Sequence, residues 1–216
     1  HCHTRRQRQM CIRDRFLALL IAISANSFAI QKGDWIVRGG ITNVAPQDNT
    51  GGVVTVDSKT NPTATIAYLV TDKIGVEILL GLPFNHDINA GGVKVGEGSH
   101  LPPTLTAQYY FDETEFGLRP YIGVGYNYTF FLEDKITITT GGLAGGHLKI
   151  GNSTGFAYQV GFDLKISEGY GINLDIRRMN IENKAHITNI ASPMEFNVAL
   201  DPTTIGLSLY LSLIHI

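Results

Sequence analysis

The sequence predicts an all-β fold, an eight-stranded antiparallel transmembrane β-barrel with short periplasmic turns and long extracellular loops. Eight segments alternate apolar and polar residues with period two, which places the two kinds of side chain on opposite faces of a strand. Charged residues make up only 17% of the chain, against roughly 25% in soluble domains. The connections alternate between short and long. Such a pattern is typical of a sheet that closes in lipid, where every backbone polar group needs an internal partner.

Each segment is expected to turn an apolar face to lipid and a mixed face to the barrel interior. The segments are residues 35–42, 65–70, 74–82, 104–111, 121–130, 156–166, 172–177 and 204–211. One neighbouring pair from each segment shows the two faces. In chain order, with the outward residue first and the inward residue second, the pairs are Trp35 and Ile36, Ile66 and Thr65, Ile74 and Gly75, Leu105 and Thr104, Ile122 and Tyr121, Phe156 and Ala157, Ile172 and Asn173, and Ile205 and Thr204. The first three segments alternate less cleanly than the other five. Tyr110, Tyr128 and Tyr170 lie near segment ends and are expected in the aromatic girdles of a membrane barrel.

The connections fix the orientation of the predicted barrel. Residues 71–73, 112–117 and 167–169 form short turns, which face the periplasm in barrels of this kind. The long connections are rich in Gly, Asn, Thr or Ser and are expected outside the cell; they are residues 43–63, 85–102, 132–153 and 187–199.

The region before the barrel predicts export. Residues 16–23 read FLALLIAI, Arg13 and Arg15 precede them, and Ser27-Phe28-Ala29 supplies small residues at the cleavage positions. This is the three-part pattern of a secretory signal, so we expect a signal peptide over 16–29 and a mature barrel over 30–211. A single membrane anchor is the alternative, but eight apolar residues are too few to span a bilayer. The expected location is the outer membrane of a Gram-negative cell.

Two terminal segments differ in character from the rest of the chain. Residues 1–15 and residues 212–216 resemble translated sequencing-adapter read-through, and we interpret them as a non-native leader and tail. No chemistry is therefore assigned to residues within them. Both cysteines, Cys2 and Cys11, precede the apolar stretch, so the predicted mature chain has no disulfide and no thiolate site.

Composition narrows the class of partner. A net charge of -2 gives no basic field for nucleic acid, and outer-membrane lipid is the expected surroundings of the barrel. A soluble β-barrel or sandwich would show the same alternation. It would, however, turn a face rich in Gly and Thr toward water, where exposed surfaces normally carry more Lys and Glu.

Six charged residues fall on the predicted inward face: Arg38, Glu77, Asp163, Lys165, Asp175 and Arg177. One interpretation makes them a gate or a selectivity ring. The favoured interpretation is a luminal charge network, centred on Arg38, Glu77, Asp163 and Asp175, since unpaired buried charges cost several kcal/mol.

No pattern in the chain predicts catalysis, a metal or a cofactor. His86, His100, His147 and His186 lie in or beside the predicted loops without the short spacing of a zinc site, and we interpret them as surface residues. Ser99-His100 is the one adjacent pair that a lipid enzyme could use, which is weak support for that function. The protein is therefore expected not to be an enzyme.

Several stretches resemble one known family along residues 33–210. They are GDWIVRGG (33–40), YLVTDKIGVE (68–77), LPFNHDI (82–88), HLPPTLTAQYYF (100–111), LRPYIGVGYNYT (118–129) and LDP (200–202). Together these resemble the outer membrane protein W (OmpW) family. The resemblance implies an eight-stranded barrel with an unusually apolar lumen that passes small hydrophobic molecules, with lateral release through the wall as one route. It also implies docking of phage or bacteriocin, a role in envelope stress, and insertion by the barrel-insertion machinery.

The resemblance also implies a constriction formed by an inward leucine and a tryptophan. The leucine matches Leu79, whereas the tryptophan position falls at about Arg177, which is a departure from the family. A second departure is the end in Ile216, because such barrels usually finish on an aromatic residue.

Two functions follow as hypotheses. The first is a narrow channel or binding pore for small hydrophobic molecules, with an apolar pocket near Leu79, Leu69 and Met179 and with Arg177 at its constriction. The alternative is a plugged structural or docking barrel that acts through its extracellular loops. Its lumen would be closed by Arg38, Glu77, Asp175 and Arg177.

Overall fold

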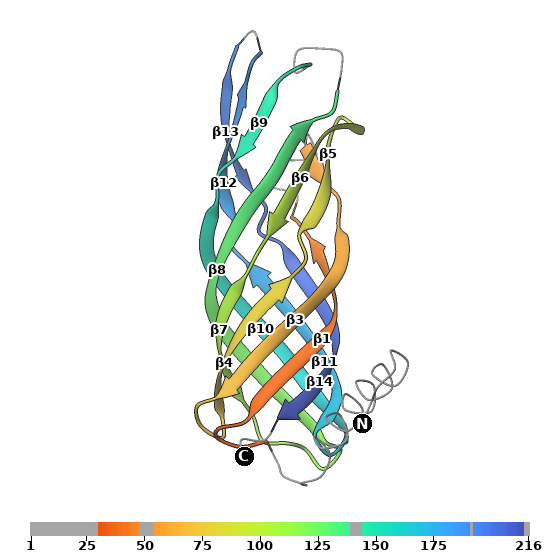
Figure 1. Ribbon diagram of the computed structural model, residues 1–216, viewed down its shortest axis with the longest axis vertical. Coiled ribbons are helices and arrows are strands. Elements are labelled where there is room, and N and C mark those ends of the chain that lie inside the picture. The colour runs from red at the N-terminus through yellow and green to blue at the C-terminus, as the bar shows by residue number, and fades with distance from the viewer. Residues whose placement is uncertain (1–29, 48–53, 139–143, 191, 214–216) are drawn as a thin grey trace, which may run out of the picture.

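The computed structural model describes residues 30–47, 54–138, 144–190 and 192–213, and all regular structure in these ranges is β (Figure 1). The expected leader and signal peptide, residues 1–29, lie outside the described residues. No helix in the described ranges is long and apolar enough to cross a membrane.

Eight antiparallel strands close into a barrel, as predicted. In the order of their neighbours they are β10 (Ser153–Ser167), β11 (Tyr170–Met179), β14 (Thr203–Leu213), β1 (Trp35–Ala45), β3 (Lys59–Leu69), β4 (Ile74–Gly81), β7 (Thr104–Tyr110) and β8 (Leu118–Ile136). Pairing of β8 with β10 closes the ring. The short turns predicted after β3, β7 and β10 all lie at one rim, which is the lower end in Figure 1.

The predicted inward and outward faces are confirmed along the barrel strands. On β1, Trp35 and Ile41 are about half exposed, whereas Arg38 is 1% exposed. Outward aromatic side chains form two belts, with Trp35, Tyr68, Tyr109, Phe111 and Tyr170 near the turn rim and Tyr126, Tyr128, Phe130, Phe156 and Tyr158 toward the other end. Belts of this kind mark the membrane interfaces of outer-membrane barrels. Tyr110 corrects one expectation, since its ring is fully buried inside the barrel and belongs to neither belt.

Six further strands build the wall upward beyond the outer belt. They are β2 (Val54–Val56), β5 (Phe84–Ala90), β6 (Val93–Leu101), β9 (His147–Ile150), β12 (Glu182–Thr188) and β13 (Met194–Ala199). The first three pair with each other and with β8, and the last three form a separate sheet above β10 and β11 (Figure 1). The long connections predicted as extracellular loops are therefore largely extended sheet, because strand pairing continues past the bilayer wherever backbone groups find partners.

One part of the wall lacks ladder pairing within the described residues. Leu79 of β4 pairs with Thr104 of β7, and Phe84 of β5 pairs with His100 of β6, but residues 80–83 and 101–103 between these pairs are not joined across the seam. Pro83, Pro102 and Pro103 have no N–H to donate, which explains the interruption. We call residues 80–83 and 101–103 the proline seam.

The last strand extends slightly beyond the predicted barrel boundary at residue 211. Ser212 pairs with Ile36 and Leu213 with Trp35, while residues 214–216 lie outside the described part of the chain.

Candidate functional site

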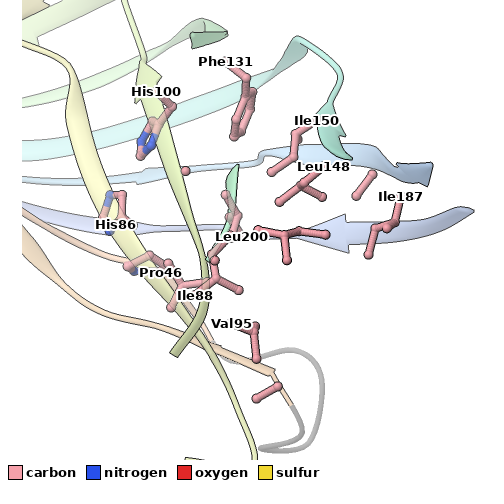
Figure 2. Close-up of a pocket in the computed structure, with 16 residues that line it drawn as sticks. Pro46, His86, Ile88, Val95, His100, Phe131, Leu148, Ile150, Ile187 and Leu200 are labelled. Carbon is pink, nitrogen blue, oxygen red and sulfur yellow. The ribbon is translucent and has the colours of Figure 1, made fainter. Parts of the chain in front are cut away.

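An apolar chamber lies among the extracellular strands, above the membrane part of the barrel. Its volume is about 160 Å³. The side chains around it are mostly aliphatic and come from separate strands, among them Val56, Ile88, Val95, Ile136, Ile150 and Ile187. Figure 2 shows that Phe131, Leu148 and Leu200 surround the same space. The chamber is therefore large enough and apolar enough to hold a small apolar molecule.

A stack of nearly parallel rings forms one wall of the chamber. His86 and His100 lie with ring centroids 4.9 Å apart at an interplanar angle of 16°, between Phe84 and Phe131. His86 is 4% and His100 is 3% exposed. The expectation of surface histidines is thus wrong for these two residues, because β5 and β6 continue the inward face of the barrel strands. It holds for His147 and His186, which are exposed.

The two buried imidazoles are neutral at physiological pH. His86 Nδ1 lies 2.5 Å from the carbonyl oxygen of Asp57, which can only accept a hydrogen bond. His86 therefore carries its proton on Nδ1 and leaves Nε2 as a bare acceptor. Burial lowers the pKa of His86, and it lowers the pKa of His100 to about 3, with His86 adding to the effect on His100.

This neutrality predicts that the extracellular strands lose stability in acid. Below a pH near 6.5 the opened state binds protons on these residues, whereas folded His100 resists protonation until about pH 3. Stability is therefore full above pH 6.5 and falls by up to about 1.4 kcal/mol per pH unit for each such histidine below it. The charged groups of Lys59, Asp57 and Asp87 face His86 and change how much His86 contributes to this pH dependence.

Hydrogen-exchange protection factors measure this effect strand by strand. Amides of β5 and β6 are expected to lose protection between pH 6.5 and 4.5, relative to those of β10 and β11. The His100→Phe variant serves as the control, because it should reduce the slope for the same strands. Equal slopes in both proteins would contradict the assignment to His100.

A narrow apolar gap lies beside the proline seam, next to the ring stack that forms one wall of the chamber. Leu79 and Met179 line it, together with Phe84 and Pro102. Leu80 and Gly81 of the seam border the same gap, although the Leu80 side chain is 45% exposed on the outer surface. The predicted neighbours Leu79 and Met179 therefore come together at the point where the wall is unpaired.

Below this gap, ion pairs cross the lumen. Arg38 contacts Glu77 at 2.8 Å and Asp163 at 2.7 Å, and its guanidinium also donates to the hydroxyl of Tyr110. Arg177 contacts Glu77 at 2.7 Å and Asp175 at 2.6 Å. Glu77 of β4 therefore joins the two arginines, Arg38 on β1 and Arg177 on β11, and β11 is the strand opposite β4 in the ring. We call Arg38, Glu77, Asp163, Asp175 and Arg177 the charged plug.

Amide side chains fill the remaining space of the charged plug. Gln159 donates to Asp175 at 3.1 Å and accepts from Gln108 at 3.0 Å. Asn173 donates to Asp163 at 2.8 Å. Within the described residues, Arg177 Nη1 is buried without a hydrogen-bond partner. Lys165, which was predicted to face inward with this group, is instead exposed near the turn rim.

An aromatic layer seals the lumen beneath the charged plug. Tyr110, Tyr121 and Tyr210 pack with Ile36 and Leu69, and all five are almost fully buried. Leu69 thus lies on the periplasmic side of the plug, and its predicted place in one pocket with Leu79 and Met179 is wrong. The reason is its position at the turn end of β3, four residues from Thr65, which pairs with Leu79.

The chamber lining was missed by the sequence analysis. One usable signal was present, since Phe84, His86 and Ile88 alternate with Asn85 and Asp87 in the pattern of a strand with an inward face. Within the part of the chain that the structure describes, no three His, Cys, Asp or Glu residues are grouped to hold a metal ion.

Comparison with known proteins places this architecture in a family. The sequence profile of the OmpW family matches residues 31–210. The chain belongs to the OmpW family. Outer membrane protein W of Vibrio cholerae is 39% identical in an alignment of 201 positions, and the alignment covers 86% of this chain and 92% of that protein.

Two further proteins resemble this chain, one in structure and one in sequence. The crystal structure of the outer membrane protein OprG from Pseudomonas aeruginosa superposes with a TM-score of 0.75 at 30% identity, over 86% of this chain and 98% of that one. A more distant relative, 25% identical over 80% of this chain and 85% of its own, is named dibenzothiophene metabolism operon protein PahQ of P. aeruginosa. This OmpW-family chain is therefore an outer-membrane protein.

Proposed function

We propose that the protein takes small hydrophobic molecules from outside the cell into the chamber and releases them sideways through the proline seam. The observation that carries this proposal is the position of the chamber. It stands directly above a lumen closed by the charged plug and beside an unpaired part of the wall.

Passage straight down the lumen is disfavoured by the electrostatics of the plug. The side chains of Arg38, Glu77 and Arg177 are 3% exposed or less. Separating such ions without new partners leaves buried charges uncompensated, at a cost of several kcal/mol. An apolar solute supplies no partner, so it cannot replace the contacts that it would break.

The lateral route requires less disruption. At the proline seam the backbone ladder is already open, so the wall can part without the loss of strand hydrogen bonds. Leu80 and Leu82 on the outer side, which are 45% and 59% exposed, provide an apolar surface that continues into lipid. The name of the relative PahQ, which refers to a dibenzothiophene metabolism operon, supports an apolar cargo.

The route predicts that Leu79→Arg abolishes most of the uptake. A guanidinium in the apolar gap would need water or a carboxylate, and would fill the space that the solute needs. We expect the rate of p-xylene uptake to fall by about fivefold or more, which corresponds to roughly 1 kcal/mol. Uptake is measured with labelled p-xylene in Gram-negative cells that lack other OmpW-family proteins.

Val70→Arg is the matched control, because it adds the same charge to a half-exposed residue at the turn rim. Heat-modifiability on gels verifies that each variant is folded. Unchanged uptake in folded Leu79→Arg would exclude the proposed route.

That outcome would favour the alternative, a plugged barrel with a structural or docking function. Two features support it: the charged plug closes the lumen, and the β-structured extension above the membrane offers a surface to a phage or a bacteriocin. The corresponding test is adsorption of such agents to cells with and without residues 182–199.

A further inference from the structure

The chamber contains a polar feature that an alkane would not use. Within the described residues, neither ring nitrogen of His100 takes part in a hydrogen bond, and the ring lines the chamber (Figure 2). His86 Nε2 is also buried without a partner among these residues. A buried polar group without a hydrogen-bond partner costs about 1–3 kcal/mol of stability. A ligand that supplies the missing partner therefore binds more tightly, because it removes part of this cost.

The state of these nitrogens specifies what a ligand must offer. His86 Nδ1 is committed to the Asp57 carbonyl oxygen, so Nε2 can only accept. Neutral His100 presents one N–H and one bare nitrogen. A hydroxyl group suits this arrangement, since it donates one hydrogen bond and accepts another. A carboxylate does not suit it, because no cationic side chain lines the chamber within the described residues.

Shape and size narrow the ligand further. Phe84, His86, His100 and Phe131 stack within 30° of parallel, which favours a flat aromatic partner over a branched aliphatic one. The chamber volume of about 160 Å³ is close to that of a protein cavity of about 150 Å³ that binds benzene. One six-membered ring with small substituents therefore fits, and a second fused ring is at the limit.

We propose that the chamber is a binding site for a single-ring phenol, whose ring packs against Phe131 and whose hydroxyl bonds to His100. This assignment rests on the proposed function and specifies its cargo. It makes His100 a specificity-determining residue, because the imidazole distinguishes a phenol from a hydrocarbon of the same shape. His86 is held in place by Asp57 and keeps the ring stack in register.

The test compares two compounds of equal shape, p-cresol and p-xylene, on the detergent-solubilised full barrel. Dissociation constants are measured by calorimetry for the native chain and for His100→Phe. The phenylalanine keeps the ring stack and removes an unpartnered polar group, so the variant is expected to fold. One hydrogen bond predicts that p-cresol binding weakens by about fivefold to tenfold, while p-xylene binding stays within about twofold.

A second measurement does not depend on the variant. With ¹⁵N-labelled histidine, p-cresol should shift the imidazole nitrogen resonances of His100, and p-xylene should leave them nearly unchanged. The phenol assignment is wrong if His100→Phe alters both affinities equally, or if p-cresol causes no shift of the His100 nitrogen resonances. In that case the chamber still binds apolar molecules, as the proposed function requires. If the native chain binds neither compound, the proposed function itself is wrong.

Discussion

Glu77→Gln is expected to destabilise the barrel by about 3–5 kcal/mol, the largest single effect that we predict. The Glu77 carboxylate is fully buried and contacts both Arg38 and Arg177. Glutamine keeps the size but has one acceptor oxygen where Glu77 has two, so one of the two guanidiniums would face an NH2 donor, and each arginine keeps a single carboxylate, Arg38 with Asp163 and Arg177 with Asp175. Removal of one ion from a buried ion pair costs several kcal/mol of stability, whereas replacement of the entire pair by apolar residues often costs little.

Urea unfolding in lipid vesicles, followed by tryptophan fluorescence of Trp35, measures this change. The matched control is Asp112→Asn, which removes the carboxylate of an exposed pair with Lys73. That pair lies in water, which screens the attraction, so its loss should leave the free energy of unfolding nearly unchanged. If the two variants lose the same free energy of unfolding, burial of the Glu77 ion pairs does not strengthen their contribution to stability.

A triple substitution separates charge compensation from packing. Glu77→Met, Arg177→Met and Asp175→Asn together leave Arg38 paired with Asp163 as the two remaining charges of the plug. We expect the triple variant to be more stable than Glu77→Gln, since buried ion pairs can often be replaced by uncharged residues of similar volume. Lower stability of the triple variant would contradict this account.

The barrel was predictable from the sequence because lipid constrains every spanning strand in the same way. An outward residue at Trp35 makes Arg38 inward, whatever its partners are, since strand geometry alone sets the alternation. The same alternation placed Glu77, Asp163, Asp175 and Arg177 in the lumen. Their pairwise contacts depend on the register between strands that are distant in sequence, and no local pattern gives that register.

The chamber could not be predicted in the same way. Its walls come from short strands outside the bilayer, where both faces of a strand may be polar and the period-two signal fades. Residue type was also a poor guide to the burial of His86 and His100, since histidine in a polar segment is commonly exposed. Leu69 and Leu79 share the inward face, and only the pairing of β3 with β4 reveals that they lie at different levels.

Filling the chamber is expected to abolish ligand binding while the barrel stays folded. Ala185 on β12 is fully buried and its side chain faces the chamber. In Ala185→Phe, a phenyl ring would occupy most of a space of about 160 Å³, which is the space that a ligand ring needs. We expect p-xylene affinity to fall by at least about tenfold, or roughly 1.4 kcal/mol.

The neighbouring residue on the same strand provides the control for this substitution. His186 is exposed on the opposite face of β12, so His186→Phe adds the same ring outside the chamber and should leave affinity unchanged. Overpacking at Ala185 costs about 1–3 kcal/mol, and it falls on the extracellular sheet, so gel mobility of the barrel should not change. Because the charged plug lies below the chamber, blocking the chamber should also stop uptake in cells. If Ala185→Phe loses binding but keeps uptake, solutes reach the proline seam by a path that avoids the chamber.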